Sequence, residues 1–486
     1  MIRGAFAFAI AVLAILAMPA LAEDAPVPFD RAGWLFDLGQ LRDAMSSDYA
    51  NLEWAVAARG MDLKATYTEA QRGIEAAADE AAARKALGKF LAAFADGHIE
   101  IHRKAAVPEA VPDSSGAVPL CERLGYFDVG ESGAVATHLR GFHAIGANPE
   151  SRFPVGLVSV AGRRVGILRV PVFMPQGFPD ICASVIAAVH LTPSSPCDGT
   201  CKERLGKIAD ERYMAGFEAQ LHALLAAKPD ALLLDLAGNG GGNDSALAIA
   251  RMLSGRDIHP PRMGFVRGAR WANEFAGEQS TIDSALAKAP EPAHAFLASL
   301  RARLVQAQKA ALMPCDRSAL WDDLPIGCSA IVAAPRYAAG LLTDRLPAAY
   351  RGEPWAETVS STVRFHYTAK QWRGPLIVLI DGNSASASEL LAAMVQDNHA
   401  GLVIGAPSYG AGCGHGLEHQ PIVLKHSGGR VLLPDCVFLR DDGRDEVGGI
   451  DPDMLIGFHD RTTAYQRAQR LEAALPAAVA RAVAGR

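Results

Sequence analysis

Three serines spaced by alanines follow an apolar run in the second half of the chain. The run at 376–380 predicts a buried strand, and Ser384, Ser386 and Ser388 lie between it and a helix expected to begin near Ser386. A serine at such a strand-to-helix elbow exposes its hydroxyl at the positive end of the helix, where it can act as a nucleophile. A helix N-cap would explain one of these serines without any chemistry, but it explains all three less well.

A second apolar run, at 231–236, leads into a turn that contains four glycines between Gly238 and Asn243. Backbone N–H groups of such a turn can bind an anion, either a phosphate or the oxyanion of an acyl transfer. The dinucleotide-binding pattern would need glycine at position 243, where Asn243 stands. An oxyanion hole and an ordinary tight turn are the two remaining interpretations.

A histidine follows an amphipathic helix near the N-terminus. Leucine and phenylalanine repeat at helical spacing over 87–94, which predicts a helix that ends near Asp96 and Gly97, just before His98. A lone histidine is more often structural than catalytic, so His98 becomes interesting only if a nucleophile needs a base.

Together and in this order, the motifs resemble the C-terminal-processing (tail-specific) serine peptidase family. The matching segments are DGH at 96–98, DLAGNGGG at 235–242, GNSASASELLAAMVQD at 382–397, GLVIGAPSYG at 401–410 and EVGGIDPD at 446–453. The resemblance implies an α/β fold with a crotonase-like ββα spiral core, and Ser386 as the nucleophile. It also implies that the backbone N–H groups of Gly241 and Ala387 form the oxyanion hole.

One departure from the family bears on the identity of the base. The branch with a Ser/Lys dyad carries its lysine in a segment after the nucleophile, where this sequence has Ala411. The tricorn-like branch uses a histidine and a glutamate instead, and His98 and Glu446 occupy the matching places. The resemblance therefore implies a Ser386–His98–Glu446 triad, in which histidine moves the proton and the carboxylate orients the ring.

Other residues are alternatives for these roles. His415 lies near the vacated lysine position and is the alternative base, and Asp445, beside Glu446, is the alternative carboxylate. Asp397 is interpreted as an anchor for the end of its helix, with a direct role as the alternative.

No cofactor is expected. The pairs His98–His102 and His415–His419 have i, i+4 spacing, but neither belongs to an H-E-x-x-H motif, so the sequence predicts no metal site. The proposed acyl transfer needs no organic cofactor either.

Composition and the N-terminus indicate an exported protein. The 486 residues carry a net charge of −6, which is not basic enough for a nucleic-acid-binding protein. Arg3, an apolar stretch at 5–18 and Ala20-Leu21-Ala22 predict a cleaved signal peptide over residues 1–22. No later window approaches spanning length, so we expect a periplasmic or secreted protein without a stable membrane span.

Export makes disulfides the default for the eight cysteines. Eight cysteines allow 105 pairings. Proximity in the sequence favours Cys197–Cys201 and Cys315–Cys328, which leaves Cys121–Cys182 and Cys413–Cys436.

The predicted elements divide the chain into several regions. Residues 23–104 form an N-terminal helical region, and 105–160 form a connecting region rich in Cys, Gly and Pro, too short for the peptide-binding PDZ domain of many family members. Apolar runs at 165–173, 231–236, 376–380, 402–404 and 430–439 predict strands, and they alternate with helical windows. The peptidase core is expected over 161–255 and 371–460, interrupted by an insertion or lid at 256–370 and followed by a C-terminal helix at 461–486.

The sequence thus predicts an exported serine endopeptidase that acts on peptides or unfolded proteins; the oligomeric state stays open. The alternative is a peptide-binding protein that kept the fold and lost catalysis, which the missing lysine at Ala411 favours. A crotonase-type acyl-CoA enzyme would also use backbone N–H groups to bind an oxyanion. Export argues against this function, because acyl-CoA substrates are intracellular.

Overall fold

The computed structural model describes residues 29–102, 118–130, 133–146, 152–341, 346–415, 420–458 and 461–485. The predicted signal peptide lies outside these described residues.

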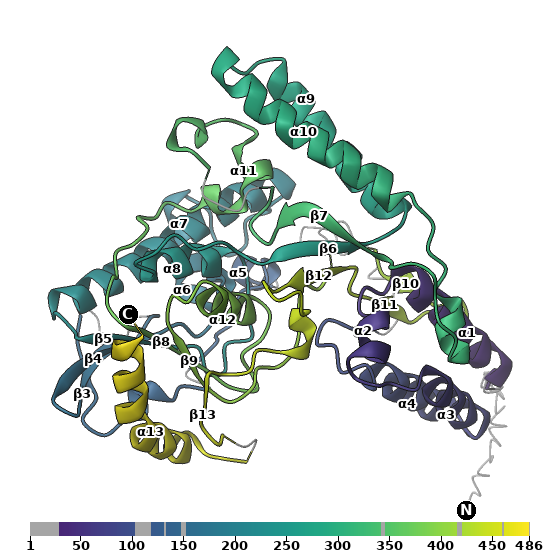
Figure 1. Cartoon of the computed structure of the whole chain (residues 1–486), viewed down its shortest axis with the longest axis horizontal. Coiled ribbons are helices and arrows are strands. Elements are labelled where there is room, and N and C mark those ends of the chain that lie inside the picture. The colour runs from purple at the N-terminus through teal and green to yellow at the C-terminus, as the bar shows by residue number, and fades with distance from the viewer. Residues whose placement is uncertain are drawn as a thin grey trace, which may run out of the picture.

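A seven-stranded mixed sheet forms the centre of the molecule (Figure 1). Its strand order is β13-β9-β8-β5-β4-β3-β2. In that order the strands are Met454–Leu455, Leu402–Gly405, Leu376–Ile380, Ala231–Asp235, Arg163–Arg169, Val155–Val160 and His143–Ala144. The strands from β13 to β4 are parallel, whereas β3 and β2 are antiparallel to their neighbours. The α/β prediction is therefore confirmed.

Helices cover both faces of this sheet, which explains why its central strands are apolar throughout. In β5, Leu232 and Leu234 face one cluster, while Leu233 faces the other. The first cluster contains α6, α7, α8 and α12, and the second contains α13. These helices are Pro179–Ala188, Gly199–Ala226, Ser245–Leu253, Ala387–Asp397 and Ala464–Ala484. A strand buried on both faces cannot alternate polar and apolar residues.

Four helices build the N-terminal region: α1 (Arg31–Asp48), α2 (Leu52–Ala57), α3 (Leu63–Glu75) and α4 (Glu80–Ala92). Aspartates cap three of them, because the carboxylates of Asp30, Asp62 and Asp79 each accept an N–H from the first turn. The helices pack against a small sheet of β1 (Glu100–His102), β11 (Arg430–Leu432) and β10 (Ile422–Val423). Segments from both ends of the chain thus meet in one cluster.

The predicted strand at 430–439 is wrong as a single element. The chain forms β11 and then β12 (Cys436–Leu439), which belong to two different sheets. Pro434 lies between them, and proline lacks the N–H that a continuous ladder would need. Its carbonyl accepts the N–H of Ala50 from the N-terminal region instead.

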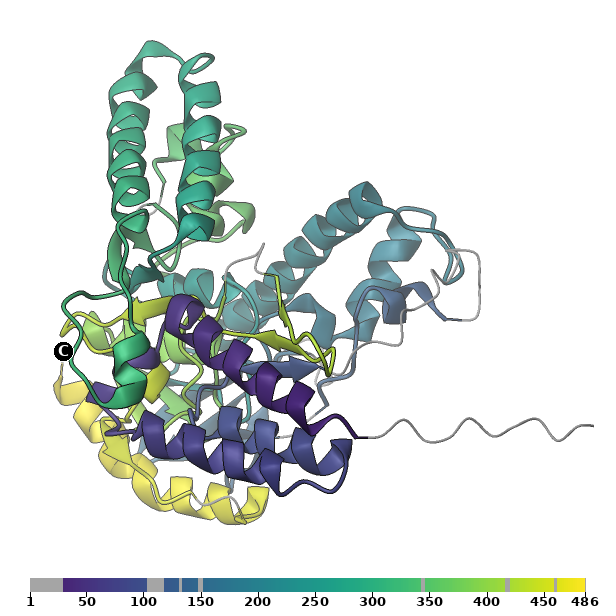
Figure 2. The same cartoon turned by 90° about the vertical axis from the view of Figure 1, so that its right-hand side faces the viewer.

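The inserted segment forms a sheet and a helical hairpin. β6 (Arg262–Val266) pairs with β12 and with β7 (Ile331–Tyr337). Between β6 and β7, α9 (Ala269–Leu286) and α10 (Glu291–Ala311) bury apolar side chains against each other. Figures 1 and 2 show this hairpin projecting away from the central sheet. Among the shorter helices, α5 (Leu120–Arg123) lies in the connecting region and α11 (Ala356–Val359) in the insertion.

All eight cysteines are paired, and the pairs are the four that the sequence analysis favoured. Cys121–Cys182 joins α5 to α6, and Cys413–Cys436 joins the loop after β9 to β12. Within the described ranges, no helix combines the length and the apolar character needed to cross a bilayer.

Candidate active site

Ser386 occupies the elbow between β8 and α12. It is the N-cap of α12, with φ 53° and ψ −114°, a conformation that a residue with a side chain rarely adopts. The two flanking hydroxyls are used structurally: Ser384 donates to the carbonyl of Leu236 and Ser388 to that of Asn239, each at 2.8 Å. Of the three serines, Ser386 is the one that is not buried.

The glycine turn lies directly against this elbow. A Cβ on Gly241, whose φ is +103°, would lie 2.8 Å from the Cβ of Ser386 and 2.7 Å from the carbonyl oxygen of Ala385. Only glycine therefore allows this approach. The N–H of Gly241 donates to Oδ1 of Asn239 at 2.8 Å, whereas the N–H of Ala387 has no hydrogen-bond partner among the described residues. Of the two expected oxyanion donors, Ala387 is thus open and Gly241 is occupied.

The turn that carries His98 is held by the N-terminal helices. Asp96 accepts hydrogen bonds from the hydroxyl of Tyr49 at 3.0 Å, the amide of Asn51 at 2.7 Å and the backbone N–H of His98 at 3.0 Å. Burial raises the pKa of Asp96, although these donors and His98 oppose the shift. The position of His98 therefore depends on the fold of residues far from it in the chain.

The His98 ring contacts the loop that follows β9. Its Nδ1 lies 2.6 Å from the carbonyl oxygen of Ala411, and a Cβ on Gly414 would lie 3.2 Å from the ring. A carbonyl oxygen can only accept, so Nδ1 carries a proton, and in the neutral ring Nε2 then has the lone pair. This tautomer is the one that a general base needs.

Glu389 is a buried carboxylate that the sequence analysis did not select. Its Oε2 accepts the backbone N–H of Ser386 at 2.7 Å and that of Ala411 at 3.0 Å. Its Oε1 accepts the hydroxyl of Ser408 at 2.6 Å and the N–H of Gly410 at 2.7 Å. One carboxylate therefore ties the serine elbow to the loop whose carbonyl holds His98.

Glu389 did leave a signal in the sequence, since Ser386-x-x-Glu389 matches the capping-box pattern. That pattern predicts only the local bonds between Ser386 and Glu389. The contacts with residues 408–411 arise from tertiary packing.

Glu446 begins a short 3₁₀ turn that packs against the same loop. It is 1% exposed, and neither carboxylate oxygen has a hydrogen-bond partner among the described residues. Burial raises the pKa of Glu446 strongly, and the nearby cation Arg440 opposes the shift. The next residue, Val447, packs against the loop, because a Cβ on Gly412 would lie 3.2 Å from it.

The alternative residues have distinct surroundings. Asp445 is half-buried and accepts the N–H of Val447 at 3.0 Å; the desolvation of its carboxyl, together with the nearby Asp96, raises its pKa to about 7. Asp397 forms a bidentate ion pair with Arg440 at 2.5–2.9 Å, in keeping with an anchoring role. His415 is half-buried, and residues 416–419, which follow it, are not among the residues that the structure describes.

No group of three or more potential metal ligands occurs in the part of the chain that the structure describes. His102, which shares helical spacing with His98, pairs with Glu100 at 2.7 Å.

The sequence pattern of Peptidase family S41 matches residues 204–456, which is more than half of the 486-residue chain. The chain therefore belongs to peptidase family S41. The resemblance drawn from the motifs is confirmed at the level of the family.

Particular relatives share parts of this chain. A carboxy-terminal-processing protease of Bartonella bacilliformis is 36% identical over 83 residues, which cover 17% of this chain and 18% of that protein. The match thus spans less than a fifth of that relative's length. The structure of mature CPAF complexed with lactacystin is similar with a TM-score of 0.58 at 14% identity, covering 94% of this chain and 99% of that one. Mature CPAF alone gives 0.57 at 14% identity, with coverage of 93% and 98%. At this level of identity, the likeness establishes a common fold.

Proposed function

We propose that the chain is an exported serine endopeptidase that cleaves peptides or unfolded proteins through an acyl-enzyme on Ser386. The observation that supports the proposal is the hydrogen-bond network from Ser386 through Glu389 and Ala411 to His98, which links the proposed nucleophile to the proposed base. A triad is defined by geometry and roles, so the order of its members along the chain is no objection.

In the proposed reaction, Ser386 Oγ attacks the carbonyl carbon of the scissile peptide bond, and His98 Nε2 takes the hydroxyl proton. The proton then passes to the leaving amine as the C–N bond breaks, which leaves an ester on Ser386. A water molecule attacks the ester, again with His98 as base, and releases the new carboxylic acid. Each cycle returns Ser386 and His98 to their starting states.

The oxyanion of each tetrahedral intermediate would bind the N–H of Ala387, at the positive end of α12. Gly241 is the proposed second donor, and its N–H would have to turn from Asn239 toward the substrate. Glu446 is the proposed third member of the triad; because the carbonyl of Ala411 is the partner of His98 Nδ1, Glu446 would support the imidazolium cation through its charge when ionised. We also assign the chain to the tricorn-like branch of the family and its catalytic core to the crotonase-like ββα spiral fold.

Export is supported by the N-terminal signal pattern and by the four disulfides, which persist in oxidising compartments. The inactive peptide-binding alternative rests on the missing lysine. The hydrogen bond between His98 Nδ1 and the carbonyl of Ala411 leaves Nε2 available to accept a proton, which argues against the inactive alternative.

Digestion of an unfolded, labelled protein by the purified mature chain tests the proposal. We expect wild-type protein to release peptides, and Ser386→Ala and His98→Ala to release none. His415→Ala serves as the matched control: retained activity supports His98 as the base, whereas loss in His415→Ala and retention in His98→Ala would reassign it. No cleavage by well-folded wild-type protein would favour the inactive alternative.

A further inference from the structure

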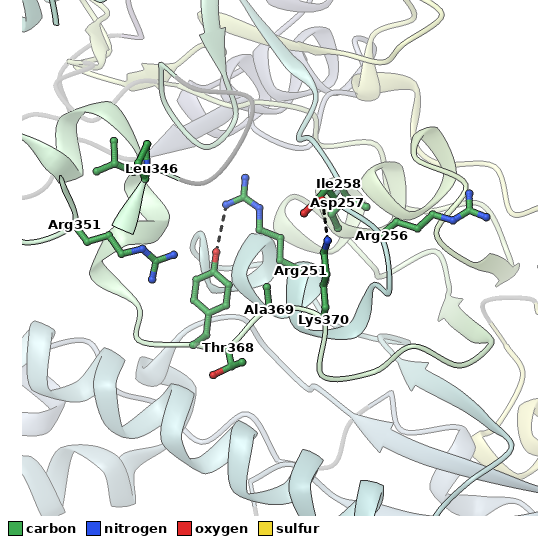
Figure 3. A pocket seen from close by; sticks show the side chains of 11 residues that line it. Arg251, Arg256, Asp257, Ile258, Leu346, Arg351, Thr368, Ala369 and Lys370 are labelled. Atoms are coloured by element: carbon green, nitrogen blue, oxygen red, sulfur yellow. Dashed lines mark hydrogen bonds and ion pairs between the residues drawn. The ribbon is translucent and has the colours of Figure 1, made fainter. Parts of the chain in front are cut away.

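A cavity of about 740 Å³ lies apart from the candidate active site, between the end of α8 and the inserted segment (Figure 3). Its walls come from Arg251 in the last turn of α8, from residues 256–258 just beyond it, and from the inserted residues 346–370. None of these residues belongs to the Ser386–His98 network.

Cationic side chains outnumber carboxylates around this cavity. Arg251, Arg256, Arg351 and Lys370 line it, against the single carboxylate of Asp257, which lies 2.7 Å from Lys370 Nζ. In Figure 3, the side chains of Arg251 and Arg351 extend toward one another, whereas Arg256 extends away from both. The cavity therefore has a positive potential that favours an anion.

Arg251 is fixed before any ligand arrives. Its side chain is buried, and Nη1 donates to Thr362 Oγ1 at 3.0 Å and to the hydroxyl of Tyr367 at 3.4 Å. The carbonyl of Arg251 accepts the N–H of Lys370 at 2.8 Å, so this carbonyl at the end of α8 is already satisfied by the insertion. A cation in the last turn of a helix is favoured by the helix dipole. That explains Arg251, and the ion pair with Asp257 explains Lys370, but neither explains Arg351.

The lining also contains apolar side chains. Ile258, Leu346 and Pro347 contribute to the same cavity, and its volume falls within the range of about 300–1,000 Å³ that is typical of sites for organic ligands. Guanidinium groups bind carboxylates through paired hydrogen bonds. A carboxylate attached to a peptide fits this mixture of charge and apolar surface better than a bare inorganic anion does.

We propose that this cavity is an exosite that binds a carboxylate-bearing segment of the polypeptide substrate, an inference that rests on the proposed peptidase function. The carboxylates come either from acidic side chains or from the C-terminus of the substrate. α8, nine residues long, begins beside the glycine turn and ends at the cavity, a separation of about 13 Å along its axis. The exosite therefore contacts a part of the substrate that is remote from the scissile bond, so its loss raises KM and leaves kcat unchanged.

Binding to the Ser386→Ala variant tests the exosite without any catalysis. The probes are four fluorescent peptides: one with glutamates near its C-terminus and its glutamine counterpart, each with a free or an amidated C-terminus. We expect fluorescence anisotropy to show that Arg351→Gln and Lys370→Gln each raise the Kd of the best peptide about tenfold, the effect of one charge-assisted hydrogen bond. Lys85→Gln, which removes an exposed cation on α4 that does not line the cavity, is the matched control and should change Kd less than about twofold.

The peptide set separates the two sources of the carboxylate. Loss of binding on glutamate-to-glutamine exchange assigns acidic side chains, and loss on amidation assigns the C-terminus. Equal binding of all four peptides, or an equal effect of Lys85→Gln and Arg351→Gln, would overturn the proposal. Labelling of the wild-type protein by a serine-reactive probe reads the peptidase function separately, so peptide binding without labelling would refute that function and leave the binding site standing.

Discussion

Replacement of Glu389 by glutamine perturbs the link between nucleophile and base with a minimal change in shape. An amide has one acceptor oxygen where the carboxylate has two, and each oxygen of Glu389 accepts two hydrogen bonds. If the NH₂ group takes the place of Oε2 it faces two N–H donors, and if it takes the place of Oε1 it faces the N–H of Gly410 and a hydroxyl that can reverse; two bonds to a carboxylate oxygen are lost either way. A hydrogen bond to a charged group contributes about 1.5–3 kcal/mol, so the loss is at least about 3 kcal/mol.

That free energy corresponds to a factor of roughly 100. We therefore expect Glu389→Gln to react with a fluorophosphonate serine probe about 100-fold more slowly than wild-type protein, measured as a labelling rate constant at neutral pH. Ser408→Ala removes only one of the four donors and is the graded control, with a loss of no more than about tenfold. Near-UV circular dichroism of the same samples gives the folded fraction.

Two results would refute this reasoning. Folded Glu389→Gln protein that labels at the wild-type rate would show that the network does not position Ser386 and His98. A decrease in labelling that only follows the folded fraction would assign Glu389 a structural role alone.

Three further predictions concern the surroundings of the site. Glu446→Gln should reduce labelling strongly while the Tm changes little, because a buried carboxyl without hydrogen bonds is replaced by an amide of the same shape; a lower Tm with full labelling would contradict its proposed role. The pKa of Asp445 is raised from 3.8 to about 7, so the folded chain binds the proton of this carboxyl more tightly than the unfolded chain does. The protonated Asp445 therefore contributes stability that is complete below pH 3.8 and is lost as the pH rises through 7. Asp445→Asn should flatten the Tm profile between these values, and an unchanged profile would refute the assignment. Replacement of Cys413 and Cys436 by serine should lower the free energy of unfolding by about 3 kcal/mol and slow labelling. The same change at Cys197 and Cys201 should leave labelling unchanged. Equal effects of the two pairs on labelling would show that the first disulfide does not help to hold the loop after β9.

Local sequence predicted the elements whose signals are local. The strand at Leu376–Ile380, the elbow at Ser386 and the turn at Gly238–Gly242 all follow from apolar runs that end in small residues. Because the two strands are adjacent and parallel, the turn and the elbow meet at the same edge of the sheet. This juxtaposition could be anticipated from the α/β pattern.

Long-range partners could not be predicted in the same way. Because alanine replaces the dyad lysine at position 411, the sequence indicated no role for Ala411 at the site. In the structure, the backbone carbonyl of Ala411 forms a hydrogen bond with His98. A carbonyl is present at every position, so no residue type signals such a contact. Likewise, Pro434 divides an apolar run between two sheets, and a run alone does not specify which sheet its residues join.

The central claim is that Ser386 is a nucleophile activated by His98. The most direct measurement is labelling of the purified mature protein with a fluorophosphonate probe, followed by mass spectrometry of the modified peptide. We predict a single adduct on Ser386, with labelling abolished in Ser386→Ala and reduced by at least about 100-fold in His98→Ala. Folded wild-type protein that stays unlabelled, or an adduct on another residue, would contradict the account.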